Sequence, residues 1–237
     1  MEVRDGFIIG IFNYCDSWCE RCPFTSRCHV FAHRAEMEAR LDPQYAAIVN
    51  APARPEEVVP PPPRWMQELI EEMNDACRNP PSAEELARFQ PRVPVEHAPV
   101  NARAKEYAFR TFRWLQVRET SSPGGRDDAY EVVSWFHFMI GAKINRALTV
   151  WPDDDDELVS SDADGSAKVA LIGIERSHAA WLSLVERDLV SAGDAEPFIT
   201  DLVWLGQELE RIRPHARAFV RPGFDEPDDV ARLLASC

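Results

Sequence analysis

The sequence lacks any apolar run long enough to cross a membrane, since a spanning helix needs about 20 consecutive apolar residues. It is also short of basic residues, with 26 lysines and arginines against 40 acidic residues and a formal net charge of −14. An acidic surface repels phosphate backbones. These absences argue against a membrane span and against nucleic acid as a partner.

Several catalytic signatures are missing as well. The sequence has no glycine-rich phosphate loop, no nucleophile elbow and no His-Glu-x-x-His zinc motif. The apolar patch that follows Met1–Asp5 is too short for a signal peptide. We therefore expect a cytoplasmic protein in a reducing compartment, where disulfides are disfavoured.

Against these absences, one stretch concentrates cysteine. Four of the six cysteines lie within residues 15–28, with the spacing C-x3-C-x2-C-x5-C. Thiolates are soft ligands that suit zinc or an iron–sulfur cluster, and ligands this close in sequence enclose one centre with little loop-closure entropy. The spacing predicts a metal site formed by Cys15, Cys19, Cys22 and Cys28.

The choice of metal stays open. Structural zinc sites usually combine two Cys-x-x-Cys turns, whereas here the single turn Cys19–Cys22 is bracketed by two lone cysteines, which slightly favours a [4Fe–4S] cluster over zinc. Reduced thiols without a metal are the alternative. His29 and His33 follow on one helical face; they are alternative ligands, although supporting or surface roles are favoured.

The prolines divide the chain. We expect a cysteine-rich module at 1–41, a proline-rich linker at 42–63 and a helical bundle at 64–237. The linker is interpreted as a spacer, with a proline motif for a partner domain as the alternative. Thr25 or Ser26 is expected to cap a helix that places Cys28 in its first turn.

Apolar periodicity predicts short helices at 64–78 and 82–89 and long ones at 100–119, 127–150, 166–190 and 197–219, with a tail helix at 227–235. Pro197 is expected near the start of its helix. The acidic stretch 151–164 is predicted to be a solvated loop, and it fails the calcium-binding template of an EF-hand. Four long helices joined by turns predict a mainly α fold with an antiparallel four-helix bundle.

Polar residues on the predicted stripes suggest a second metal site. Glu175 and His178 form a Glu-x-x-His turn, which resembles the ligand pair of carboxylate-bridged di-metal bundles. His137 lies on the stripe of the preceding helix beside Glu131, and Glu106 and Glu208 offer further carboxylates. The family requires two such turns and this chain has one, so ordinary hydrogen-bonded polar groups are the favoured interpretation.

Two further resemblances involve the cysteines. Cys15, Cys19 and Cys22 resemble the cluster loop of radical S-adenosylmethionine enzymes, but the repeated βα units of that family are replaced here by long helices. Residues 18–28 and 165–171 resemble stretches of uncharacterised bacterial helical proteins. That second resemblance implies no activity, only that the cysteine loop and the bundle belong together.

Three functional hypotheses follow. The leading one is a non-enzymatic metal-binding protein that holds zinc or [4Fe–4S] and serves in redox sensing or partner docking. The second is a redox or oxygen-handling metalloenzyme with a further site at Glu131, His137, Glu175 and His178. The third is a metal-free helical interaction protein. The expected partners are another protein or a second copy of the chain, with neither nucleic acid nor membrane.

Overall fold

The computed structural model describes residues 2–40, 64–78, 80, 82, 92–119, 127–150 and 157–225, and this part of the chain is mainly helical. The predicted linker 42–63, the tail helix 227–235 and, apart from Ser82, the short helix 82–89 lie outside it. No helix in the described ranges is long and apolar enough to span a bilayer.

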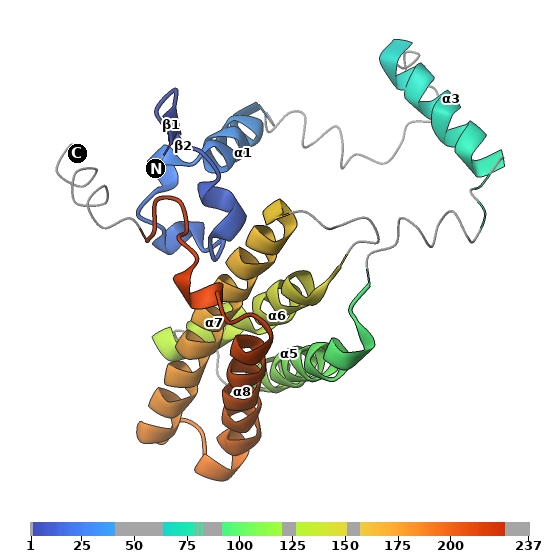
Figure 1. Cartoon of the computed structure of the whole chain (residues 1–237). Coiled ribbons are helices and arrows are strands. Elements are labelled where there is room, and N and C mark those ends of the chain that lie inside the picture. Colours follow the sequence, from blue (N-terminus) through green and yellow to red (C-terminus); the bar gives the residue numbers. More distant parts are fainter. Residues whose placement is uncertain are drawn as a thin grey trace, which may run out of the picture.

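The elements appear in Figure 1 in chain order. They are β1 (Val3–Arg4), β2 (Phe7–Ile8), the 3-10 helices η1 (Ile11–Tyr14), η2 (Cys19–Arg21) and η3 (Thr25–Arg27), α1 (His29–Arg40), α3 (Arg64–Arg78), η4 (Val95–His97), α5 (Ala98–Glu119), α6 (Asp128–Leu148), α7 (Glu157–Glu186), α8 (Ala192–Ile212) and η5 (Ala216–Ala218).

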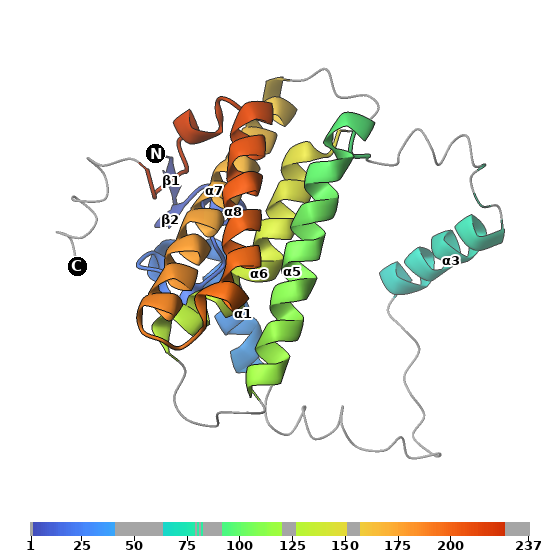
Figure 2. The ribbon, with the colours of Figure 1, turned by 90° about the horizontal axis from the view of Figure 1, so that it is seen from below.

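The four long helices pack side by side around one core (Figure 2). Helix α6 contacts α5 and α7, and α8 contacts α7 and α5. Each helix turns one apolar stripe inward, as its sequence period predicts. The largest fully buried side chains of these helices are Tyr107, Phe136, Ile140, Ile144, Leu148, Leu171, Trp181, Leu184, Leu202 and Leu205.

Helix α6 begins close to where the sequence predicts. The Asp127 carboxylate accepts a hydrogen bond from the backbone N–H of Ala129 at 2.9 Å, which satisfies one of the free donors of the first turn. Arg187, just beyond the end of α7, donates to the same carboxylate at 2.7 Å. The cap of one helix is thereby tied to the end of its neighbour.

The predicted acidic loop 151–164 is wrong over its second half, because α7 begins at Glu157. Asp162 lies inside this helix and forms an ion pair with Arg146 of α6 at 2.8 Å. Gly165 is helical too, and a Cβ at this position would overlap the Tyr14 ring. Packing against these neighbours therefore overrides the low helix propensity of the segment.

The start of α8 also differs from the prediction. Ser191 caps the helix by accepting from the backbone N–H of Asp194 at 3.1 Å, so Pro197 lies inside the helix instead of in its first turn. Pro197 has no N–H for the Gly193 carbonyl, and both residues are exposed, which leaves that carbonyl open to water. The helix ends at Ile212, before Pro214, and not at Phe219.

The N-terminal residues form a short hairpin. Strands β1 and β2 pair antiparallel, with Val3 opposite Ile8. The two turn residues, Asp5 and Gly6, have φ values of 51° and 87°. Positive φ at both central positions is the geometry that joins twisted strands tightly, and Asp-Gly is a preferred pair for it.

The helix predicted from Ser26 begins later. Thr25–Arg27 form η3, Cys28 is extended with φ −106° and ψ 113°, and α1 starts at His29. The Cys28 carbonyl accepts from the N–H of Ala32 at 3.0 Å, so Cys28 precedes the first turn of α1 instead of lying in it. The predicted cap at Thr25 or Ser26 is accordingly wrong.

A second, smaller core lies under the cysteine segment. Ile8, Ile11 and Phe24 are buried together, with the half-buried Cys22 and Cys28 against them. The C-terminal end of the described chain completes this core, because Phe224 packs edge-to-face on Phe24 at a centroid distance of 5.2 Å. Figure 1 shows this red segment running back to the blue N-terminal module.

Candidate metal centre

The four clustered cysteines sit at the ends of three short 3-10 helices. Cys15 follows η1, Cys19 opens η2, Cys22 follows η2, and Cys28 follows η3. All four are reduced and half-buried. The chain between them turns sharply at Ser17, whose φ is 57°. The segment is thus a set of tight turns that presents sulfur at each junction.

The pKa of the Cys19 thiol is raised above its ordinary value. Burial raises its pKa, the neighbouring Cys15, Glu20 and Cys28 raise it further, and Arg34 partly offsets this. Mutual effects of this kind operate only between groups that lie near one another. The local environment therefore gathers thiols but disfavours free thiolates.

The thiol of Cys22 behaves in the same way. Burial raises its pKa, the backbone N–H of Phe24 opposes the rise, and Asp16, Cys15 and Cys19 add to it. The Cys15 thiol is engaged elsewhere, since it donates to the Phe12 carbonyl with an Sγ–O distance of 3.4 Å. A metal ion would have to displace protons from these thiols before binding them.

As the chain stands, the cysteines are not arranged as a ready metal cage. In the part of the chain that the structure describes, no group of three or more His, Cys, Asp or Glu side chains is placed to hold a metal ion. His29 and His33 lie on the exposed side of α1, with ring centroids 6.4 Å apart, and His29 packs on Phe7. Binding at the four thiols therefore requires the turns to draw together.

The residues between the cysteines anchor this loop to the long helices. Asp16 pairs with Arg176 of α7 at 2.7 Å, and its backbone carbonyl accepts from the indole N–H of Trp135 on α6 at 2.8 Å. A second oxygen of the Asp16 carboxylate accepts from the backbone N–H of Trp18 at 3.1 Å. One aspartate thereby shapes the turn and attaches it to two helices.

Trp18 is the apolar anchor of the loop. Its ring is 9% exposed and belongs to the main core, where it contacts Trp135 and Phe136 of α6. The Arg21 guanidinium also lies over this indole, 4.1 Å from the ring centroid. The tryptophan between Cys15 and Cys19 is thus continuous with the core of the helices.

Arg21 is the polar anchor. It lies between Cys19 and Cys22 and forms ion pairs with Asp128 at 2.6 Å and with Glu131 at 2.5 Å, both in the first turn of α6. Acidic residues at a helix start are favoured by the helix dipole, and Arg21 adds a partner for each. Glu131, a predicted metal ligand, is committed to this arginine.

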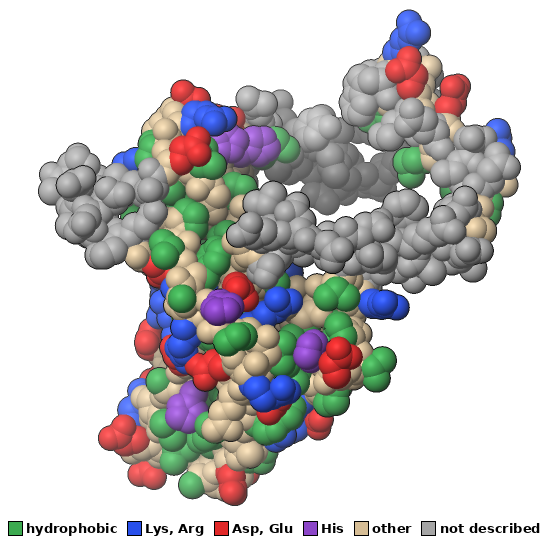
Figure 3. All heavy atoms as spheres, viewed as in Figure 1, with side chains coloured by type: hydrophobic (Ala, Val, Ile, Leu, Met, Phe, Trp, Pro, Cys, Tyr) green, Lys and Arg blue, Asp and Glu red, His purple; other side chains and the backbone are tan. Residues whose placement is uncertain are grey.

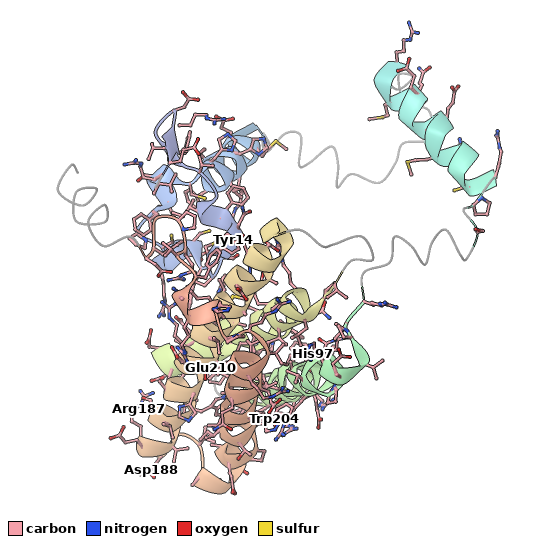
Figure 4. The ribbon with its side chains drawn as sticks, in the orientation of Figure 1. Tyr14, His97, Arg187, Asp188, Trp204 and Glu210 are labelled. Atoms are coloured by element: carbon pink, nitrogen blue, oxygen red, sulfur yellow. The ribbon has the colours of Figure 1, made fainter. Side chains whose placement is uncertain are left out.

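Tyr14 makes the last connection, immediately before Cys15. Its hydroxyl donates to Asp162 of α7 at 3.1 Å, and its ring packs on Phe219. Figure 4 labels Tyr14 where the N-terminal module meets α7. Lys143 of α6 adds a hydrogen bond to the Asn13 carbonyl at 3.2 Å. The cysteine segment is therefore fastened to α6 and α7 at several points.

The C-terminal segment closes the module by an ion-pair network. Asp225 pairs with Lys168 of α7 at 2.8 Å and with Arg221 at 2.9 Å. Burial acts to raise the pKa of Asp225, but hydrogen bonds from Arg221 and Lys168 hold it well below its usual range. This network positions Phe224 beside the cysteine turns.

A cavity of about 670 Å3 lies between the cysteine loop and helices α6 and α7. Its volume falls in the range of small-ligand pockets. Its lining includes three aromatic residues, two arginines and one cysteine: Trp18, Phe136, Phe224, Arg21, Arg176 and Cys22. The cavity therefore lies against Cys22, one of the four predicted ligands.

The residues predicted to form a second metal site lie at separate places. Glu131 pairs with Arg21, as described. His137 is 7% exposed and stacks on Phe112 of α5, with its Nδ1 2.7 Å from the Ser134 carbonyl oxygen. Burial lowers the pKa of His137. This histidine therefore faces α5, on a different side of α6 from Glu131.

Glu175 and His178 do share one surface. They line a cavity of about 280 Å3 between α7 and α8 together with Glu210. Arg217 forms ion pairs with both carboxylates, with Glu175 at 2.7 Å and with Glu210. The other two candidate carboxylates, Glu106 and Glu208, pair with arginines of their own helices. The second metal site stays a prediction that this placement does not assemble.

Sequence reasoning missed the polar groups inside the helical core. Asp201 is 4% exposed and pairs with Arg103 at 2.7 Å and Arg110 at 3.3 Å. Tyr107 is fully buried, and burial raises its pKa to about 12. The period of a helix marks its inward face, but it does not reveal the partners of Tyr107 or Asp201 across the core.

Comparisons with protein-family models, with curated proteins and with solved structures found no match for the chain. Its function must therefore be argued from the site.

Proposed function

We propose that the protein binds one metal centre through Cys15, Cys19, Cys22 and Cys28, and that this centre is zinc or a [4Fe–4S] cluster. The proposal rests on one observation above all. The turns that carry Cys15, Cys19 and Cys22 are fastened to α6 or α7 through Asp16, Trp18, Arg21 and Tyr14. Cys28 packs on the smaller core of the same module, and all four thiols are reduced and half-buried. A thiolate-bound ion would complete a loop whose outer side is already fixed.

The proposed role is non-enzymatic. A metal ion that draws the four turns together changes the shape of a segment that packs directly on the helical core, so metal loss or thiol oxidation is transmitted to α6 and α7. This suits redox sensing or metal-dependent docking of a partner. The helices are proposed to form an antiparallel four-helix bundle, which is supported by the closed ring of contacts from α5 through α8.

A metal-free helical interaction protein is the second candidate. It is favoured by the lack, among the described residues, of a group already placed to hold a metal. It is also favoured by the exposed aromatic side chains of α5 and α6, of which Phe109 is 54% and Phe138 43% exposed. In that case the cysteine segment is a structural cover for one side of the helices.

Anaerobic purification followed by metal analysis and an absorption spectrum separates these candidates. A brown protein with sulfide-to-iron absorption indicates a cluster, and a colourless protein with about one zinc per chain indicates a zinc site. The double variant Cys19→Ser/Cys22→Ser should lose the metal. Cys77→Ser is the matched control, because Cys77 is exposed on α3, outside the clustered residues.

Two results would overturn the proposal. A folded protein that contains no metal under these conditions supports the interaction protein instead. Iron or manganese that persists after all four clustered cysteines are replaced by serine supports the metalloenzyme with a site inside the helices.

A further inference from the structure

A group of aromatic side chains is exposed on the outer surface formed by α5 and α6. Phe109, Phe112 and Phe138 are 54%, 37% and 43% exposed. Their rings touch, with centroid distances of 5.7 Å between Phe109 and Phe138 and 5.5 Å between Phe112 and Phe138. We call these three residues the aromatic patch. Contiguous apolar surface of this kind marks an interaction site.

His137 lies beside the aromatic patch and is buried against Phe112. Its ring is nearly parallel to that of Phe112, at a centroid distance of 6.2 Å and an interplanar angle of 9°. Its Nε2 atom is buried and has no hydrogen-bond partner among the described residues. Burial lowers the pKa of His137, so the neutral ring adds apolar surface under the patch.

Helix α3 carries the complementary surface. Met66, Ile70 and Met73 recur four and three residues apart, which places them on one face. They are 37%, 43% and 61% exposed, and α3 stands away from α5–α8 in Figures 1 and 2. A helix of this length is marginal on its own in water, so its stability depends on covering this face.

The charges of the two helices are opposite. In a chain of net charge −14, α5 holds five basic and two acidic residues, whereas α3 holds four acidic and two basic residues. Lys105 and Arg113 lie one helical turn to either side of Phe109, and both are exposed. Glu68 and Glu71 of α3 are exposed on the side opposite Met66, Ile70 and Met73. The attraction is therefore between the net charges of the two helices. On the face shown in Figure 3, acidic and basic side chains are interspersed.

The segment that connects α3 to α5 is long enough for α3 to reach the aromatic patch. The 13 residues 79–91 separate Arg78 from Arg92, and a chain of that length spans at most about 45–50 Å. Helix α5 is about 33 Å long, and Phe109 lies near its middle. The tether therefore lets α3 reach the patch within the same molecule.

We propose that α3 docks on the aromatic patch of its own chain, with Met66, Ile70 and Met73 against Phe109, Phe112 and Phe138. This makes α3 a movable cover for the α5–α6 surface. Methionine-rich faces adapt to such aromatic surfaces because the side chain is flexible and polarizable.

Hydrogen exchange of the full-length protein tests this docking. The α3 amides should exchange at least about tenfold more slowly in the wild type than in Phe109→Ser/Phe138→Ser. Ile70→Ser/Met73→Ser should give the same loss without touching α5 or α6, and it should increase the binding of a hydrophobic dye to the uncovered patch. Val203→Ser, at an exposed position of α8, is the control and should leave α3 protected.

Charge reversal gives a second test that does not depend on the apolar residues. Lys105→Glu/Arg113→Glu should speed exchange of α3, and adding Glu68→Lys/Glu71→Lys should restore protection. Three results would overturn the proposal: α3 amides that exchange equally fast in every variant, protection that persists when the patch is altered, or protection that rises with protein concentration, which would mean docking on a second copy.

Discussion

Trp18 stacks on Trp135, with ring centroids 5.1 Å apart and planes inclined by 13°. The first residue lies between two clustered cysteines and the second lies on α6, so the cysteine loop and the helices share one aromatic core. The carbonyl of Asp16, two residues before Trp18, accepts a hydrogen bond from the same Trp135. The thiol segment is consequently part of the fold of the helices.

Trp18→Ala is expected to destabilise the protein by about 3–5 kcal/mol, because it removes a buried indole and leaves a cavity. Chemical denaturation measures the free energy of unfolding. Val203→Ala, at a position that is 44% exposed, should change it by less than about 0.5 kcal/mol. A Trp18 variant as stable as this control would show that the loop does not share the core.

The buried carboxylate of Asp201 should be essential to the packing of α5 on α8. Asp201→Asn leaves Arg103 and Arg110 without their common anionic partner, and we expect a loss of about 2 kcal/mol, since both arginines retain partial contact with solvent. Glu106→Gln removes an exposed partner of Arg110 and should cost less than about 1 kcal/mol. If both variants lowered the free energy of unfolding equally, the buried ion pair of Asp201 would be no more important than the exposed pair of Glu106.

The raised pKa of Tyr107 predicts how the free energy of unfolding changes at alkaline pH. Burial raises its pKa from 10 to about 12 in the folded state, so its contribution is complete below pH 10 and is lost as the pH rises toward 12. The loss amounts to about 3 kcal/mol. Tyr107→Phe should remove this component, which unfolding curves measured at pH 9 and pH 11 would reveal. An unchanged pH slope in the variant would contradict the assignment.

Metal affinity should rise with pH. The raised pKa values of Cys19 and Cys22 mean that binding releases protons from these thiols, and each released proton changes the affinity by about tenfold per pH unit. Competition titration with zinc at pH 6 and pH 8 measures this. Glu20→Gln removes a charge that raises the pKa of Cys19, and should bind zinc at least as tightly as the wild type at pH 7. Affinity that does not vary with pH would argue against binding through these thiols.

Much of the fold follows from sequence periodicity, but the ends of its elements depend on tertiary contacts. The stripes of α5, α6 and α8 and the helix Arg64–Arg78 are predicted because apolar residues recur with the helical period. The early start of α7 is not, because Asp162 and Gly165 read as loop residues until Arg146 and Tyr14 are placed beside them. The hairpin is a different case, since Asp5-Gly6 is a signal that the sequence does contain.

The candidate site is divided in the same way. Cysteine spacing predicts the four ligands, because the chemistry of the side chains and their proximity along the chain can both be read from the sequence. The sequence does not reveal that Asp16, Trp18 and Arg21 anchor the loop, because their partners lie more than a hundred residues away. Glu175 and His178 are the opposite case. Their Glu-x-x-His motif can be read from the sequence, but Arg217 from another segment forms an ion pair with Glu175.

The most direct test of the account is thiol alkylation of the native protein, read residue by residue by mass spectrometry. In protein purified anaerobically, Cys15, Cys19, Cys22 and Cys28 should be protected together while the exposed Cys77 reacts, and a chelator should expose all four at once. If the four thiols react independently of one another, and a chelator changes nothing, the cysteines do not hold a metal and the central claim is wrong.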